Sequence, residues 1–280
     1  MSEFNTASCG GIPGISDTFA SALWTIDYTL QLALDDAAGQ NGGYHAVYLH
    51  TRELNISYSL FLPWPGPETW KARPQFYAQV VTRAALTPFP ALSGAGSDGN
   101  GSWVVEIGLG YGYDSQAAYA IYDVDQSSRP SSFPARLVLI NYADNQTTFN
   151  IPSQSSNASQ SWQNLSVIYL SAPSMNFSYD NNPSVEQNVT WGGRTLVNGT
   201  WTLLKSDQNW VGFNETMSCA SGCQITLPNS GVAVAYVGAN LPTDETGVKV
   251  AASGSISDFS RIYSIFAAMY GVIVSYILVV

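Results

Sequence analysis

The sequence predicts an α+β protein in which a region of helix and strand precedes an antiparallel β-sandwich and a C-terminal hydrophobic helix. Helical patterns at residues 16–37 and 74–86 flank a strand-length apolar run at 44–51. Short apolar runs separated by turn residues follow, and the last nineteen residues, 262–280, contain no charged side chain. The expected segments are a helix-and-strand region over 1–87, a β-sandwich over 88–240, a polar stalk over 241–261 and a hydrophobic segment over 262–280.

The first predicted helix, residues 16–37, has a start signal and an apolar face. Ser16 is a residue type preferred at the N-cap, and Asp17 suits the positive end of the helix dipole. Pro13 and Gly14 end any regular structure upstream. The apolar residues recur at helical spacing and form one stripe, made of Phe19, Leu23, Ile26 and Leu30.

The second helix is expected over residues 74–86, with Pro74 in its first turn, where proline is well tolerated. Beyond residue 87 we expect no further helix of ordinary length before the tail. The strand-length runs that make up the predicted β-sandwich are 102–109, 117–125, 135–143, 164–171, 223–228 and 231–238.

Composition and charge exclude several kinds of partner. Only 11% of the residues are charged and the net charge is −10, so a polyphosphate would be repelled and no nucleic-acid partner is expected. The glycine-rich run 108–113 has Tyr113 where a dinucleotide-binding loop needs its third glycine, and a strand is expected after it. The chain has two histidines, too few for a histidine-rich zinc site. We therefore expect no cofactor and no metal.

Asparagine usage indicates passage through the secretory route. Nine of the 18 asparagines begin N-x-[ST] sequons, the acceptor motif for N-linked glycans. The alternative is that a serine-rich chain forms such sequons without being modified. The predicted glycosylation sites are Asn55, Asn100, Asn145, Asn157, Asn164, Asn176, Asn188, Asn198 and Asn214.

Two of the three cysteines are close in sequence. Cys219 and Cys223 are separated by a short loop in which Gly222 allows a bend, so a local disulfide is expected in an oxidising compartment. Cys9 is then left over, either buried or without a partner.

The hydrophobic tail predicts a cell-surface protein. Residues 262–280 are long enough as a helix to span the apolar layer of a bilayer. No basic residue follows them, and small residues and a short polar spacer precede them, which is the order of a GPI-attachment signal. We expect attachment around Ala252, Ser253 and Gly254; a retained membrane helix and a buried helix are the alternatives. Residues 1–30 show no signal-peptide pattern, so we expect further residues ahead of Met1.

Two other patterns have structural explanations that we favour over functional ones. Trp191, Trp201 and Trp210 could stack on sugar rings, but tryptophans in a β-sandwich more often fill its core. Asp123, Asp125 and Ser127 could contact calcium, but no glutamate completes an EF-hand loop, so we expect a turn between strands.

Three stretches, residues 2–34, 44–53 and 135–143, together resemble glycoside hydrolase family 79, which contains β-glucuronidases and heparanase-type endoglucuronidases. The most specific stretch runs from SEFN to the predicted first helix. The likeness extends from residue 2 to about residue 240 and corresponds to the C-terminal half of such an enzyme. It implies that 1–87 is a partial (β/α)8 barrel and that the C-terminal β domain of the fungal members follows.

The resemblance also implies a site. Retaining hydrolysis of a β-glucuronide uses two carboxyl groups about 5 Å apart, and Glu3 in EFNTASCGG corresponds to the nucleophile. The family's acid/base glutamate follows an asparagine in an earlier strand, and this chain offers no equivalent. The implied substrate-binding residues are Asn5, His50, Arg52 and Tyr58, with Arg52 suited to a uronate carboxylate. The alternatives are a capped surface histidine at His50 and a solvated loop arginine at Arg52. The run after His50 lacks the glycine of the family pattern.

The expected partners are therefore a glucuronide-type glycan and, through the C-terminal anchor, a membrane. We expect the chain by itself to be inactive, because it lacks the acid/base residue and most of the pocket. The helix over 16–37 is also expected to expose its apolar stripe without the rest of a barrel. The alternatives are a non-catalytic glycan-binding module and a structural cell-surface glycoprotein without a ligand.

Overall fold

The computed structural model describes residues 4–34, 46–49, 56–63, 70–87, 102–109, 115–123, 133–153, 164–179, 189–197, 200–204, 211–212, 214–238 and 275–278. The N-terminal region contains α1 (Phe19–Leu32), β1 (Ala46–Leu49), β2 (Phe61–Pro63), β3 (Trp70–Ala72) and α2 (Pro74–Leu86). The following region contains β4 (Ser102–Glu106), β5 (Gln116–Asp123), β6 (Arg136–Asn141), β7 (Thr147–Ile151), β8 (Asn164–Ser171), β9 (Thr190–Trp191), β10 (Arg194–Val197), β11 (Thr200–Leu203), β12 (Glu215–Ser218), β13 (Cys223–Leu227) and β14 (Gly231–Val237). The last described element is β15 (Ser275–Leu278).

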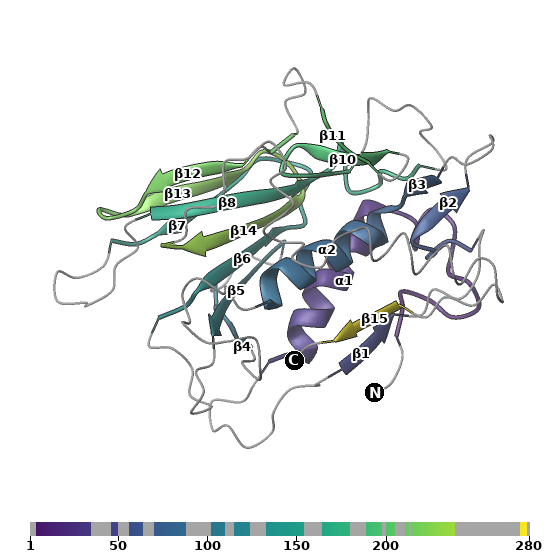
Figure 1. Ribbon diagram of the computed structural model, residues 1–280, viewed down its shortest axis with the longest axis horizontal. Helices are drawn as coiled ribbons and strands as arrows, with labels where there is room; N and C mark the ends of the chain where they lie inside the picture. The colour runs from purple at the N-terminus through teal and green to yellow at the C-terminus, as the bar shows by residue number, and fades with distance from the viewer. Residues whose placement is uncertain are drawn as a thin grey trace.

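One large antiparallel sheet organises the molecule (Figure 1). Its strand order is β2-β3-β10-β9-β8-β14-β6-β5-β4, and β11 and β12 extend it by pairing with β10 and β8. The described chain is thus mostly antiparallel β-structure with two helices, consistent with a β-sandwich domain.

The strand β14 forms the centre of this sheet. It pairs with β8 on one side and with β6 on the other, and all seven of its residues are buried. Because successive side chains along a strand point to opposite faces, β14 contributes side chains to two cores. Val232, Val234 and Tyr236 belong to the core on one face, whereas Ala233 and Ala235 belong to the core on the other.

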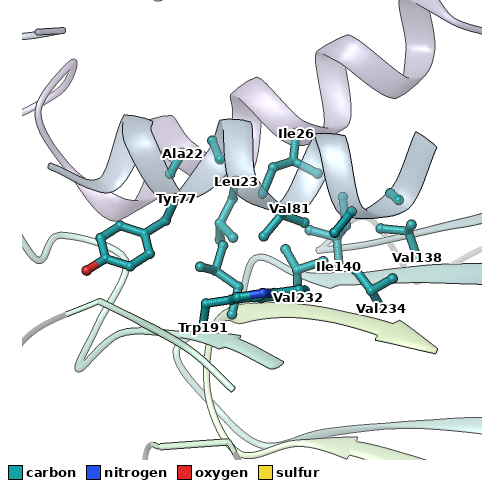
Figure 2. Packing of buried hydrophobic residues seen from close by; sticks show 14 of the residues in the cluster. Ala22, Leu23, Ile26, Tyr77, Val81, Val138, Ile140, Trp191, Val232 and Val234 are labelled. Carbon is teal, nitrogen blue, oxygen red and sulfur yellow. The ribbon is translucent and has the colours of Figure 1, made fainter. Parts of the chain in front are cut away.

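Both helices cover one face of the sheet (Figures 1 and 2). The apolar stripe of α1, made of Phe19, Leu23, Ile26 and Leu30, is fully buried at 0% exposure for every member. The expectation that this stripe would be exposed is therefore wrong. Helix α2 and the sheet cover it, with Val138, Ile140, Val232 and Val234 among the sheet residues of the same core. Burial of each such large side chain contributes about 1.5–3 kcal/mol.

A second, smaller layer covers the opposite face. Strands β7 and β13 pair as a separate two-stranded sheet. Their buried residues Phe149, Ile151, Ile225 and Leu227 pack with alternate residues of β6, β8 and β14. The second layer of the sandwich, in the part of the chain described, is therefore this two-stranded sheet.

The N-terminal region shares the large sheet with the region that follows it. Strand β3 pairs with β10 in the register Lys71 to Val197. On α2, the buried hydroxyl of Tyr77 accepts a hydrogen bond from the Leu196 amide at 2.8 Å and lies 3.0 Å from the Thr195 hydroxyl. The boundary expected at residues 87 and 88 stays a prediction, but the helices and the sheet have one continuous core.

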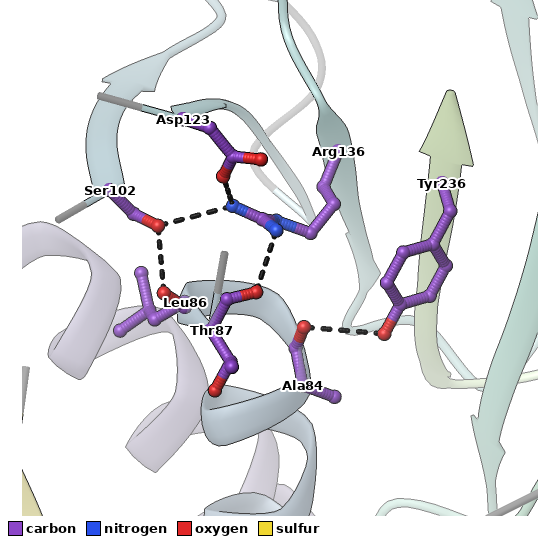
Figure 3. Close-up of polar contacts among 7 residues, drawn as sticks. All are labelled: Ala84, Leu86, Thr87, Ser102, Asp123, Arg136 and Tyr236. Atoms are coloured by element: carbon purple, nitrogen blue, oxygen red, sulfur yellow. Dashed lines mark hydrogen bonds and ion pairs between the residues drawn. The ribbon is translucent and has the colours of Figure 1, made fainter. Parts of the chain in front are cut away.

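Arg136 anchors the C-terminal end of α2 to the sheet (Figure 3). Its fully buried guanidinium donates to the Thr87 carbonyl at 2.7 Å and to the Ser102 hydroxyl at 3.1 Å, and it forms an ion pair with Asp123. The Ser102 hydroxyl in turn donates to the Leu86 carbonyl at 2.7 Å. Carbonyl groups in the last turn of a helix have no partner within the helix, and a cation there also stabilises the helix dipole.

A tyrosine of β14 adds to this anchor. Tyr236 donates its hydroxyl hydrogen to the Ala84 carbonyl at 3.2 Å, as Figure 3 shows. Burial raises the pKa of Tyr236 well above its usual value, so the hydroxyl stays a donor. The central strand of the sheet therefore contacts the same turn of α2 as Arg136 does.

Helix α1 begins at Phe19, three residues later than expected. The side chains of Ser16 and Asp17 serve the preceding loop instead of the helix. The Ser16 hydroxyl accepts from the Ile12 amide at 2.9 Å, and the Asp17 carboxylate accepts from the Gly14 amide at 2.6 Å. The helix ends at Leu32, and residues 35–37 of the expected range lie outside the described residues.

The predicted C-terminal helix is not confirmed. Residues 275–278 form the strand β15, which pairs antiparallel with β1. The polar stalk at 241–261 and the rest of 262–280 lie outside the described residues. Among the described helices, neither has the length and apolar character needed to cross a bilayer.

Candidate active site

The segment that begins at Phe4 lies beside the end of β1. Phe4 and Leu49 are paired in a parallel bridge, and the Phe4 amide donates to the Tyr48 carbonyl at 2.9 Å. Glu3 and His50 are the sequence neighbours of this pair but lie outside the described residues. Parallel pairing of two short strands connected through a helix is the local unit of a (β/α)8 barrel. One bridge does not confirm a barrel, but it brings the two predicted segments together.

Aromatic packing fixes the Phe4 segment against α1. Phe4 and Leu49 are buried, and the ring of Phe4 lies 5.9 Å from Trp24 and 5.2 Å from Tyr28. The rings of Trp24 and Tyr28 are stacked, with centroids 5.0 Å apart. Such aromatic contacts add about 0.5–1.5 kcal/mol each beyond area burial. The backbone next to Glu3 is thus positioned by a buried side chain.

The loop after Phe4 is held by buried polar groups. Asn5, a predicted substrate-binding residue, is half-buried, and its side-chain oxygen Oδ1 accepts from the Thr6 amide at 2.7 Å. The Thr6 hydroxyl donates to the Ser16 hydroxyl at 2.7 Å. Cys9 is exposed, unpaired and has φ +58°, and a turn with positive φ continues through Gly10. A contact of Asn5 with substrate stays a prediction.

Tyr58, another predicted substrate-binding residue, lies beneath this turn. It is 1% exposed, and its hydroxyl accepts from the Gly10 amide at 3.0 Å. A Cβ at Gly11, where φ is +85°, would lie 2.8 Å from the Tyr58 ring, so glycine is required there. In this arrangement Tyr58 supports the loop; a contact with substrate stays a prediction.

Arg73 is a buried cation that the sequence analysis did not identify. It is 3% exposed and donates to the carbonyls of Ile56 and Ser57 and, at 2.8 Å, to the Ser59 hydroxyl. It therefore fixes the segment that follows Arg52. Arg52 itself lies outside the described residues. No sequence signal distinguishes Arg73 from an ordinary residue ahead of a helix.

The described acidic residues have structural roles or lie on the surface. Asp17 and Asp123 are held by hydrogen bonds described above, and Asp144 accepts from the Met175 amide at 2.8 Å and from the Ser230 hydroxyl at 2.9 Å. Glu106 is exposed on β4. Over the described ranges no group of three or more potential ligands could hold a metal ion.

Asp27 of α1 is held by two tyrosines of the sheet. The hydroxyls of Tyr119 and, at 2.6 Å, of Tyr142 both donate to its carboxylate. Burial, and after it the Asp27 carboxylate, raise the pKa of both tyrosines well above the usual value, so both remain donors. This cluster attaches α1 to β5 through Tyr119 and to the residue that follows β6, Tyr142. It is not arranged as a catalytic carboxyl pair.

The chain contains an Asn-Glu dipeptide at Asn214–Glu215. Glu215 lies in β12 and accepts a hydrogen bond from the Tyr169 hydroxyl. Figure 1 places β12 on the opposite side of the molecule from β1. It also follows Glu3 in the sequence, whereas the family's acid/base residue comes from an earlier strand. Glu215 is therefore not the equivalent of that residue.

The remaining predictions for the β region have mixed outcomes. Trp191 is 1% exposed in the main core, and Trp201 packs half-buried against the same core, as we favoured. Trp210 and Asp125 lie outside the described residues. Cys219 and Cys223 form a disulfide with a Cα separation of 4.8 Å, at the turn between β12 and β13.

Four of the nine predicted glycosylation sites can be located, and each of these asparagines is exposed: Asn145, Asn164, Asn176 and Asn214. Exposure is required of a glycan-bearing residue in the folded protein, and modification stays a prediction. The other five sites, and the predicted attachment residues of the tail, lie outside the described residues: Asn55, Asn100, Asn157, Asn188, Asn198, Ala252, Ser253 and Gly254.

Comparison with known proteins gives two findings. Residues 118–234 match the family model described as the glycosyl hydrolase family 79 C-terminal beta domain. The fold is similar to the crystal structure of a 4-O-α-L-rhamnosyl-β-D-glucuronidase from Fusarium oxysporum 12S in complex with Rha-GlcA, with a TM-score of 0.54 and 20% identity. The match covers 84% of this chain and 42% of that enzyme, so the chain spans less than half of its length. No curated protein matches the sequence.

Proposed function

We propose that the chain is the C-terminal part of a retaining β-glucuronidase-like glycoside hydrolase, because residues 118–234 match the model of the glycosyl hydrolase family 79 C-terminal beta domain. The family match is the observation that carries the proposal. It is supported by the similarity in fold to a glucuronidase and by the parallel bridge between Phe4 and Leu49. The proposed substrate class is a glucuronide-type glycan.

Glu3 is the proposed nucleophile. Its carboxylate would attack the anomeric carbon while a second carboxyl group protonates the leaving oxygen, and water would then hydrolyse the glycosyl-enzyme. In the family that this chain resembles, the acid/base residue comes from an earlier strand than the nucleophile, so we propose that the second group comes from chain outside this sequence. His50 and Arg52 would contact the sugar, Arg52 through the uronate carboxylate.

The chain alone should therefore hydrolyse 4-nitrophenyl β-D-glucuronide no faster than buffer does. Activity should appear when the part of the Fusarium enzyme that lies outside the matched region is fused ahead of this chain. In that fusion Glu3→Gln should lower kcat by at least about a thousandfold, as loss of a nucleophile does. Glu106→Gln, which changes an exposed acid on β4, is the matched control and should leave kcat unchanged.

A chemical readout separates a nucleophile from a merely structural acid. In the fusion carrying Glu3→Ala, added azide should attack the anomeric carbon directly as the aryloxide leaves, which restores turnover and gives a glycosyl azide of inverted configuration. An active fusion in which Glu3→Gln keeps its turnover would reject the assignment of Glu3. Turnover by the unfused chain would contradict the proposal that the second carboxyl group comes from chain outside this sequence.

One observation favours a second candidate, a non-catalytic glycan-binding or structural module. The apolar stripe of α1 is buried within this chain, so the large core does not need another segment to cover it. Specific binding of the chain to immobilised glucuronide-containing glycans, together with an inactive fusion, would support the module over the enzyme.

We also propose an extracellular, cell-surface location. The disulfide and the four exposed sequon asparagines support an oxidising, glycosylating route. Attachment through a GPI anchor or a retained membrane helix stays a prediction about residues outside the described ranges. Release of the protein from cells by a phosphatidylinositol-specific phospholipase would distinguish the two.

A further inference from the structure

The four described sequons differ in the solvent exposure of their third residue. The hydroxyl of this residue is recognised by the enzyme that transfers the glycan. All four asparagines are exposed. The hydroxyl residues two positions later are not equivalent: Ser166 is 0% exposed and Ser178 is 1% exposed, whereas Thr147 is half-buried and Thr216 is exposed. The fold therefore hides the recognition hydroxyl of the Asn164 and Asn176 sequons.

The Asn176 sequon is hidden because it caps a helix. The Ser178 hydroxyl donates to the Asp17 carboxylate at 2.7 Å, joining residues 161 positions apart. The same segment supplies carbonyl oxygens to amides of the first turn of α1, which have no partner within the helix. These bonds run from the Phe19 amide to the Phe177 carbonyl at 2.9 Å and from the Ala20 amide to the Met175 carbonyl at 2.8 Å.

The Asn164 sequon is hidden by strand pairing. Ser166 lies in β8 directly opposite Thr216 in β12, and the two hydroxyls are 3.3 Å apart. Thr216 is itself the third residue of the Asn214 sequon. Two sequons thus lie antiparallel on neighbouring strands, with Ser166 beneath the pair and Thr216 at the surface.

We propose that Asn164 and Asn176 accept glycans only before the chain folds, whereas Asn145 and Asn214 keep their recognition hydroxyls available in the folded chain. In the transfer the asparagine amide nitrogen bonds to the anomeric carbon of a pyrophosphate-linked lipid oligosaccharide. The bond from that carbon to the pyrophosphate oxygen breaks, the lipid pyrophosphate leaves and the amide gives up one proton. Access to Ser178 requires loss of its bond to Asp17, and access to Ser166 requires separation of β12 from β8.

The inference concerns the fold and is independent of the glycosidase proposal. It can be tested on the full chain, made without glycans in an oxidising bacterial compartment so that the disulfide forms. A purified eukaryotic oligosaccharyltransferase with its lipid-linked donor is added to the folded chain and to the chain unfolded in urea and then diluted. Occupancy at the four sites is measured by glycopeptide mass spectrometry at early times.

The unfolded chain should be modified at all four sites. The folded chain should be modified at Asn164 and Asn176 at least tenfold less than at Asn145 and Asn214. Equal occupancy of the four sites in the folded chain, whether high or low, would overturn the inference, because burial of the hydroxyl would then not be the deciding property.

A variant sharpens the result for Asn176. Asp17→Ala removes the partner of Ser178 and should raise occupancy at Asn176 in the folded chain severalfold, with Asn164 unchanged. Occupancy at Asn164 serves as the internal control for global unfolding of the variant. If occupancy rises at both Asn164 and Asn176, the variant has unfolded, and the inference is then judged on the wild-type chain alone. If occupancy rises at neither site in a folded variant, the proposed role of the Asp17–Ser178 bond is wrong.

Discussion

Helix α1 has two apolar sides that lie in different surroundings. Toward the sheet, Leu23 and Ile26 are fully buried in a core that also contains residues of α2 and of eight strands of the large sheet. Toward the Phe4 segment, Trp24, Tyr28 and Leu32 are only partly buried against a small cluster. In the described part of the chain that cluster has three buried members, Phe4, Leu49 and Leu60. The stability of the chain is therefore concentrated on the side of the sheet, and the predicted catalytic segment lies on the weaker side.

The largest effect is expected where a buried charge would lose its partner. Asp123→Ala leaves the fully buried guanidinium of Arg136 without its carboxylate and should lower the free energy of unfolding by about 3–5 kcal/mol. Urea denaturation followed by circular dichroism measures the change. Glu106→Ala, at an exposed position of β4, should change stability by less than about 0.5 kcal/mol. Similar losses in both variants would contradict an anchoring role for Arg136.

The two sides of α1 can be compared directly with alanine substitutions. Leu23→Ala creates a cavity in the closed core and should cost about 2–5 kcal/mol. Leu32→Ala, on the side of the Phe4 cluster, should cost about 1 kcal/mol, because the residue is only partly buried. The same urea titration serves both variants, and equal losses would mean that the two sides contribute equally.

High pH should weaken the contact between α2 and the sheet. Burial raises the pKa of Tyr77 to about 12, from an ordinary value of 10.0. Between these values the unfolded chain releases a proton that the folded chain keeps, so stability is full below pH 10 and falls as the pH rises, by about 1.4 kcal/mol per pH unit for this residue. Tyr77→Phe should remove that share of the slope. If the free energy of unfolding depends on pH in Tyr77→Phe as it does in the wild-type chain, Tyr77 titrates normally in the folded chain.

The smallest difference is expected in local opening. The Phe4 amide, bonded to the Tyr48 carbonyl, should exchange its hydrogen at least about tenfold faster than amides of β14, because few buried contacts oppose local separation of the Phe4 segment. Hydrogen exchange followed by NMR gives both rates. Equal protection at the two places would mean that the Phe4 segment opens only when the whole chain unfolds.

Local signals predicted the regular elements well. Helix α2 occupies residues 74–86 as expected, because Pro74 marks its start in the sequence. Strand β8 likewise matches the predicted run 164–171, and β14 follows a continuous apolar run of the kind found in strands buried on both faces. Each of these elements is specified by residues that are adjacent in the sequence.

Features that depend on distant partners were missed. Strands β2 and β3 lie in a proline- and tryptophan-rich stretch for which no strand was predicted. Strand β3 joins the rest of the large sheet through β10, more than a hundred residues later. The stripe of α1 was expected to be exposed for the same reason, since the sheet that covers it comes from later sequence. The start of α1 was placed too early because Ser16 and Asp17 bond to a loop whose turns could not be foreseen.

For the candidate site, the sequence identified the chain segments that come together but not the buried residues that hold them in place. Resemblance pointed to the neighbourhoods of Glu3 and His50, and the structure pairs the adjacent residues Phe4 and Leu49. The buried guanidinium of Arg73 had no signal in its local sequence. Tyr58 was chosen as a substrate contact, although its hydroxyl is engaged by the Gly10 amide.

The position of β14 has a consequence for the order of events during translation. Strands β6 and β8 do not pair with each other; each pairs with β14, which emerges about sixty residues after β8 ends. At typical rates of synthesis this leaves several seconds in which the ribosome holds two unjoined halves of a sheet. A nascent chain that stalls ahead of Gly231 would present both halves, with the unpaired backbone edges of β6 and β8 uncovered, to chaperones and proteases.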